Sequence, residues 1–559
     1  MRSKRVFIFI MTVVFAIGLL IIYAAGKANQ GKNASEAFIQ NSVKAPGEIS
    51  VSAKNNTDFI NAISTPGVNV EEIPESSRPI LGVETAVAGF IGVTERGPLE
   101  PQLITNFSQF KDVYGDFYAD SYFAYSAKGF FENEGKKLYI ARVTSADAQT
   151  AKRELTDGTR VLALVEAISP GLWGNRISIK VSTGLNSTDD DPTFKLEVKY
   201  YDNYIPSDAG FKGTRRVHPT ARITEVFNDV SLSNLSRYSY NETVNSKSKL
   251  IKIEVKSWVS RSIPINDKDI NFLTEGSDGS KIRLSDYIGD SGKNGLPPRG
   301  LNALGDIGEI TILYSPNAQD VPGLNQAMIT QCERLQDRIV IIDTAMGDNG
   351  YENATRYNSS FAAVYSPWIE IYDSNHKSKL IPPGGYIAGT YVNSDNLGGV
   401  HKSPASVSIQ GVIGLERTIN RNEYDEYLFK KINPIVNINL RGIMAYGGRT
   451  LSDNPEYKYI NTRRYVNYIR KSILTGLRWT KYEAWGPSME SRVRTSLTDF
   501  LNSEWAKGAL RGNSPREAYH ISIYRMKKPG ESDELITVIE VGLALLRPAE
   551  FYIVSLSVE

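Results

Sequence analysis

The chain has 559 residues, a formal net charge of +2, 41% hydrophobic residues and 23% charged residues. This composition is typical of a globular protein with two to four domains, and the small net charge argues against a general nucleic-acid binder. The single cysteine excludes an internal disulfide and a zinc site built from cysteines. Cys332 lies on the apolar stripe of a predicted helix, so we expect a buried thiol rather than a reactive one.

The N-terminal end carries an uncharged apolar run, residues 6–25, that is long enough to cross a bilayer as a helix. Basic residues precede the run, which favours an anchor with its N-terminus inside. We predict a hydrophobic membrane or signal-like segment at 1–26, with membrane association through residues 6–25. The alternative is an upstream extension that the working protein lacks. An Asn-, Ser-, Lys- and Gly-rich linker follows at 27–57, and a proline-broken extended arm at 58–80.

The next part of the chain alternates strand and helix patterns, and it does so in two separate stretches. The strands are expected at 82–98, 136–143, 308–314 and 338–344, and the helices at 120–135 and 324–338. Strand, helix and strand at this spacing predict a right-handed crossover in a parallel sheet. We therefore predict an α/β core whose first part is 81–160 and whose second part is 301–430.

The stretch between the two core parts has a different character. Alternating strands are expected at 176–181, 194–201 and 250–259, separated by polar loops of variable length. We predict a β-rich inserted domain at 161–300.

After the core, two long helical patterns at 457–479 and 488–507 predict a C-terminal domain at 431–534. The chain then closes in strands at 535–559, which we expect to pair between subunits. The last strand alternates strictly, and an apolar strand left unpaired is an aggregation hazard, so we expect a partner edge. Pairing within its own domain is the alternative to β-augmentation of a neighbour. The expected linking residues are Val68 and Val70 of the arm, and Phe551, Tyr552, Ile553, Val554, Leu556 and Val558 of the last strand.

The sequence LGGVHKSPAS places His401, Lys402 and Ser403 side by side, which raises the question of nucleophilic catalysis. Neither an orienting acid nor an oxyanion site is indicated nearby, so we expect a packing loop followed by a strand at 406–414. The acidic run 188–192 is predicted to be a solvated turn. Residues 343–350 follow a buried strand, where α/β proteins often bind ligands, but they indicate a ligand site only weakly. No common nucleotide loop or G-x-S-x-G motif is present. The sequence therefore predicts no catalytic, cofactor or metal residues.

Several blocks resemble contractile tail sheath proteins, in order, from about residue 64 to 558. They include SPGLWGNRISIKV at 169–181, IPPGGYIAGTYVNSDNLGGVHKSPAS at 381–406 and EVGLALLRPAEFYIVSLSV at 540–558. Residues 65–98, 433–473 and 506–520 share the resemblance. The resemblance implies a non-enzymatic, multidomain α/β (α+β) subunit with an α/β core, a β-rich inserted domain and extended terminal strand arms. The uncharged segment before the arm departs from the family pattern.

By this resemblance, many copies polymerise around an inner tube protein, between baseplate and terminator proteins, and contract to drive the tube through a target envelope. The location would be a virion tail or a cytoplasmic phage-like particle. The C-terminal domain would lie nearest the tube, so Arg464, Lys471 and Arg478, which the apolar stripe of helix 457–479 leaves free, are expected to face acidic groups on it. One alternative is a membrane-anchored or exported surface-array protein with the same fold. Another is a hydrolase centred on His401 and Ser403.

Overall fold

In a computed structural model of the protein, the structure describes residues 78–118, 121–202, 220–257, 259, 262–292, 295, 297–347, 356–373, 375–527 and 535–548. The predicted hydrophobic segment at 1–26, the linker at 27–57, and Val68 and Val70 of the arm lie outside these residues. Residues 549–559 of the last strand also lie outside them. Within the described ranges, no helix is both long enough and apolar enough to cross a membrane.

The core is built on a nine-stranded sheet in the order β16-β19-β18-β13-β12-β11-β1-β3-β2. The central strands from β18 to β3 are parallel, while the edge pairs β2–β3, β18–β19 and β19–β16 are antiparallel. Strands β1, β12 and β13 are buried at every position, as expected for parallel strands with both faces covered. The strands are β1 Val87–Gly92, β2 Gln102–Ile104, β3 Lys137–Arg142, β11 Ile312–Tyr314, β12 Ile339–Asp343, β13 Ala362–Ser366, β16 Val407–Ser408, β18 Ile432–Ile438 and β19 Gly442–Ala445.

Helices cover both faces of this sheet. Aromatic side chains of α4, α5 and α10 form one apolar cluster with alternate strand residues, including Phe90 and Tyr314. Residues of α6, α7, α8 and α11 form the second cluster with the opposite set of strand residues, and Cys332 is fully buried within it. Burial raises the pKa of this thiol, in keeping with the predicted structural role. The helices are α4 Phe107–Tyr114, α5 Phe123–Glu132, α6 Leu284–Ile288, α7 Gly300–Asp306, α8 Leu324–Leu335, α10 Gly384–Gly398 and α11 Arg421–Phe429.

The inserted domain consists of two antiparallel sheets, in the orders β10-β6-β7-β8 and β4-β5-β9, that share one apolar cluster. Strand β7 alternates buried and half-buried residues, the period-two pattern of a strand with one face in a core. β4 lies in the range predicted for the core but pairs with β5. The strands are β4 Lys152–Thr156, β5 Val161–Ala167, β6 Ile177–Thr183, β7 Phe194–Tyr200, β8 Ile223–Val230, β9 Ile251–Val255 and β10 Asn271–Phe272. The predicted α/β fold class is confirmed, while the exact domain boundaries stay predictions.

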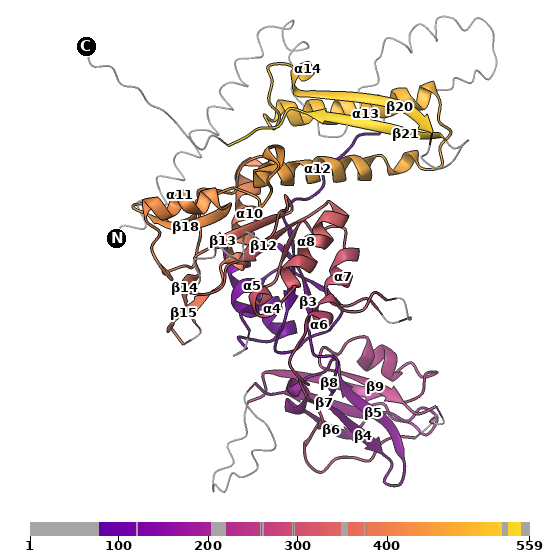
Figure 1. The fold of residues 1–559 in the computed structure, drawn as a ribbon. Helices are drawn as coiled ribbons and strands as arrows, with labels where there is room; N and C mark the ends of the chain where they lie inside the picture. The colour runs from indigo at the N-terminus through magenta and orange to yellow at the C-terminus, as the bar shows by residue number, and fades with distance from the viewer. Residues whose placement is uncertain are drawn as a thin grey trace, which may run out of the picture. The chain divides into compact units, whose positions relative to one another are not determined.

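The C-terminal domain contains the two predicted helices, α12 (Ile460–Gly476) and α13 (Pro487–Ala506). The hairpin of β20 (Tyr519–Lys527) and β21 (Leu535–Leu543) lies beside α13 (Figure 1) and joins the same apolar cluster as both helices. The sequence patterns predicted β21 but missed β20. A smaller three-stranded sheet contains β14 Ile369–Tyr372, β15 Ser378–Ile381 and β17 Gly414–Leu415. The strand predicted at 406–414 is present only as two-residue β16 and the start of β17.

Candidate functional site

The His401 loop connects α10 to β16 and is held by packing. The His401 ring meets the Tyr465 ring edge to face at 6.2 Å, and the His401 carbonyl accepts a hydrogen bond of 2.9 Å from Asn461 Nδ2. Burial and the neighbouring Lys402 lower the pKa of the histidine. Among the described residues, no hydrogen bond joins the His401 ring to the Ser403 hydroxyl. These contacts fit the predicted packing loop.

One aspartate of the acidic turn at 188–192 has a structural partner. Asp191 accepts a hydrogen bond of 2.7 Å from the Ser236 hydroxyl, and Asp189 and Asp190 are exposed. In the part of the chain that the structure describes, no group of three or more histidine, cysteine or acidic side chains could hold a metal ion.

The prediction that Arg464 lies free on α12 is wrong. Its guanidinium forms a bidentate ion pair with Asp395 of α10, with Nη1–Oδ1 at 2.7 Å and Nη2–Oδ2 at 2.6 Å, and the two side chains are only 3% and 4% exposed. The guanidinium also lies over the Tyr391 ring at 4.9 Å. Burial lowers the pKa of Arg464, but the charge and hydrogen bonds of Asp395, together with the nearby tyrosines, outweigh burial and the net shift is upward. Arg464 therefore ties the C-terminal domain to the core and cannot face a tube.

The two other basic residues of the expected tube-facing set differ from Arg464. Lys471 is half-buried, its Nζ has no hydrogen-bond partner among the described residues, and burial lowers its pKa. Arg478, just beyond α12, is exposed. A role for Lys471 and Arg478 at a tube surface stays a prediction.

A groove of about 450 Å³ runs between α12 and β21. Its walls are mostly apolar, and its lining includes Val466, Ile469, Ile473, Leu474 and Leu477 of α12 and Ile539, Val541 and Leu543 of β21. Within the described ranges, the hairpin sheet contains only β20 and β21, so each strand has one edge without a strand partner. An open strand edge beside an apolar groove can accept an extended segment, with main-chain hydrogen bonds and side-chain pockets supplied together.

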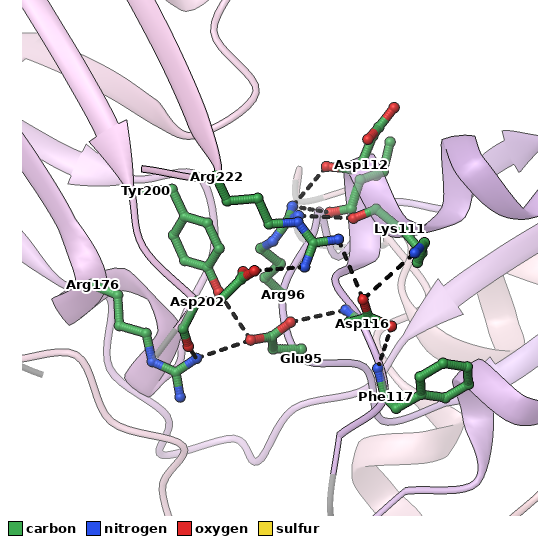
Figure 2. A network of polar contacts seen from close by, with 11 residues as sticks. Glu95, Arg96, Lys111, Asp112, Asp116, Phe117, Arg176, Tyr200, Asp202 and Arg222 are labelled. Atoms are coloured by element: carbon green, nitrogen blue, oxygen red, sulfur yellow. Dashed lines mark hydrogen bonds and ion pairs between the residues drawn. The ribbon is translucent and has the colours of Figure 1, made fainter. Parts of the chain in front are cut away.

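A network of polar contacts joins the inserted domain to the core (Figure 2). On the core side, Glu95 accepts hydrogen bonds from Arg176 at 2.9 Å, from the Tyr200 hydroxyl at 3.0 Å and from the Asp116 amide at 3.0 Å. Arg222 of the inserted domain pairs with Asp116 at 3.5 Å. Because opposite charges meet across a partly buried boundary, this network fixes how the inserted domain meets the core loops.

Arg96 adds a second connection at the same boundary. Its guanidinium donates to the carbonyls of Lys111, Asp112 and Val113 in the last turn of α4, and it lies over the Tyr200 ring at 4.9 Å. A cation at a helix C-terminus satisfies carbonyls that the helix itself leaves unpaired. No local pattern in the sequence revealed Glu95 or Arg96, because their partners lie on other elements.

Asp343, at the end of β12, lies buried beneath the N-terminus of α10. Its Oδ1 accepts from the Gly384 amide at 2.8 Å and its Oδ2 from the Tyr314 hydroxyl at 2.7 Å. Burial raises the pKa of this carboxyl to about 7, although both hydrogen bonds oppose the shift. Of the two aspartates that weakly indicated a ligand site at 343–350, Asp343 is thus hydrogen-bonded within the fold. Asp348 lies outside the described residues.

This raised pKa predicts a pH-dependent stability. Below about pH 4 the carboxyl is protonated in both the folded and the unfolded chain, whereas between about pH 4 and 7 the unfolded chain ionises first. The contribution of Asp343 to the free energy of unfolding should therefore fall by about 4 kcal/mol as pH rises through this window, then stay level. Urea unfolding at several pH values, with Asp343→Asn as the reference, measures the difference. Equal pH slopes in the two proteins would contradict the assignment.

Comparisons with known proteins agree on one family. A model of the phage tail sheath C-terminal domain matches residues 452–559. A prophage major tail sheath protein of Pseudomonas aeruginosa (strain UCBPP-PA14) is 27% identical over 223 residues, covering 38% of this chain and 58% of that protein. A tail sheath protein of Vibrio phage KVP40 is 23% identical over 256 residues, covering 43% of this chain and 38% of that protein. These alignments span less than two thirds of either relative.

Solved structures share the fold over a larger part of the chain. A sheath tail protein from Listeria innocua has a TM-score of 0.55 at 14% identity, covering 83% of this chain and 96% of that one. The helical sheath of the anti-feeding prophage in its contracted state has a TM-score of 0.51 at 18% identity, covering 89% and 99%. The chain therefore shares the multidomain α/β fold of these sheath proteins. The chain is thus similar to tail sheath proteins in sequence and in fold, and residues 452–559 match the C-terminal domain of that family.

Proposed function

We propose that this chain is the structural subunit of a contractile tail sheath that polymerises around an inner tube and contracts to drive the tube through a target envelope. Besides itself, its partners are the inner tube protein and the baseplate and terminator proteins that bound the polymer. Its location is a virion tail or a cytoplasmic phage-like particle. Contraction repacks near-rigid subunits out of a metastable extended state, so no nucleotide site is required.

The observation that carries the proposal is the open edge of β21 beside the apolar groove. One subunit offers this edge, and a second copy supplies the alternating segment Phe551 to Glu559 as an added strand. Val68 and Val70 of the arm extend the same linkage to another neighbour. Each contact joins two different surfaces, so the assembly propagates without closing on itself.

Electron microscopy of the purified protein tests the proposal, with the full sequence and a chain beginning at Val51 studied in parallel. We expect hollow cylinders, and we expect co-expression with an inner tube protein to set their length. The two chain lengths also separate an effect of residues 1–50 from an effect of the body. Monodisperse monomers from both chains, at every concentration and salt tested, would overturn the sheath assignment.

A further inference from the structure

Residues 78–85, here called the strap, form the first described segment of the chain, and they run along one row of α12. The row consists of Arg464, Tyr468, Ser472 and Gly476. These positions are four residues apart, so they form one continuous ridge on the helix surface.

The strap meets the row in reverse order. Thr85 contacts the start of the row, where its carbonyl accepts from Arg464 Nη2 at 3.1 Å and its hydroxyl donates to Asp395 at 2.7 Å. The Val83 amide donates to the Ser472 hydroxyl at 3.1 Å. The strap therefore runs antiparallel to the helix, with polar contacts at two points.

Two glycines let the backbone of the strap approach α12 closely. A Cβ placed on Gly82 would lie 2.2 Å from Tyr468 Oη, and one on Gly476 would lie 2.7 Å from Ile80 Cγ1 and 2.8 Å from Ile80 Cγ2. Ile80 is only 6% exposed, whereas the next residue, Leu81, is 76% exposed. The strap thus has one side pressed against the helix and one side in solvent.

The lengths of the two segments also agree. The five residue steps from Ile80 to Thr85 would span about 17 Å in a fully extended chain, and the twelve helical steps from Arg464 to Gly476 rise about 18 Å. At its outer end, the Arg78 guanidinium lies over the Trp479 ring at 5.5 Å. The contacts at both ends of the strap and the close-packed glycines therefore agree with a strap that lies along this row of α12.

We propose that this row of α12 is a track that anchors the root of the N-terminal arm and fixes its exit at the C-terminal end of the helix. One consequence rests on the proposed function. When a second copy pulls on the arm, the force acts on α12 and on the Arg464–Asp395 pair. The arm can then link subunits without loosening β1, which begins directly after the strap at Val87.

The test is hydrogen exchange of the full chain carrying Gly476→Ala. Alanine favours a helix over glycine, so this change would ordinarily stabilise α12. At this position the new methyl group strikes Ile80 close to its branched Cβ, which rotation of the side chain cannot relieve. We expect exchange in peptides covering Val83 to become at least about tenfold faster while β12 peptides stay unchanged.

Two controls make the result specific. Gly308→Ala adds the same methyl group where no other atom lies within 4 Å, and it should leave exchange of the strap unchanged. In an Ile80→Ala background, Gly476→Ala should have little further effect, because the side chain it strikes has been shortened. Strap exchange in Gly476→Ala that equals the Gly308→Ala control would overturn the track.

Polymerisation separates the track from the proposed function. If the wild type forms cylinders, Gly476→Ala should form fewer or shorter ones. If Gly476→Ala speeds exchange of the strap but leaves the cylinders unchanged, then α12 does not carry the force between subunits. If the wild type forms no cylinders, the proposed function fails, while the exchange experiment still decides whether the track exists.

Discussion

Replacing Asp395 with alanine is expected to lower the free energy of unfolding by about 3–5 kcal/mol, because a buried guanidinium would be left without its counter-charge. Arg464 and Asp395 are joined by two short hydrogen bonds in a site that excludes water almost completely. The Thr85 hydroxyl would also lose its acceptor, so the strap should loosen together with the helix. Urea unfolding with a circular-dichroism readout measures the loss.

A surface pair provides the matched control for Asp395→Ala. Glu490 and Arg494 of α13 are 3.0 Å apart, but their side chains are 39% and 45% exposed. Removing this pair with Glu490→Ala should change stability by no more than about 0.5 kcal/mol, because exposed pairs are screened by solvent. The double variant Arg464→Met with Asp395→Leu should recover much of the loss, since apolar side chains need no counter-charge. A loss for Asp395→Ala no larger than that for Glu490→Ala would refute the buried-pair argument.

Deleting Phe551 to Glu559 is expected to abolish polymerisation while leaving a folded body. The described part of the C-terminal domain has its own apolar cluster of α12, α13 and the hairpin. The deletion removes the strand that we propose is lent to the β21 edge of a neighbour. Sedimentation and electron microscopy measure polymer, and circular dichroism measures folding. Full-length cylinders formed by the shortened chain would place the linkage elsewhere.

The accepting side of the same contact can be tested independently. Leu474 lines the groove and is 56% exposed, so Leu474→Lys should preserve the fold but disfavour an apolar strand in the groove. Thr475→Lys adds the same charge at the next, exposed position, which is outside the groove lining. We expect Leu474→Lys to reduce polymerisation strongly and Thr475→Lys to leave it nearly unchanged. Equal behaviour of the two variants would show that the groove does not hold the strand.

Much of the architecture followed from local patterns. The buried apolar runs at β1 and β12 and the 3.6-residue periodicity of α8, α12 and α13 indicated an α/β core and a helical C-terminal domain, and the structure contains these elements. Strand β20 (YHISIYRMK) was missed because its apolar alternation is short: Tyr519, Ile521 and Ile523 pack on the apolar cluster, but Arg525 and Lys527 end the pattern. It is a strand because β21 pairs with it over nine residues.

The sequence by itself determined the alternation of strands and helices in the core, the burial of Cys332 and the resemblance to tail sheath proteins, because these depend on residue patterns along the chain. Only the tertiary structure decided which charged side chains are buried and which partners they have. Helical periodicity left Arg464 off the apolar stripe of α12, yet Asp395, 69 residues earlier in the chain, meets it in a buried pair. The same holds for Glu95 beside Arg176 and for Asp343 beneath α10. The physical reason is that a local pattern shows which face of an element is apolar, whereas the burial and the partner of a charge depend on which distant element covers the other face.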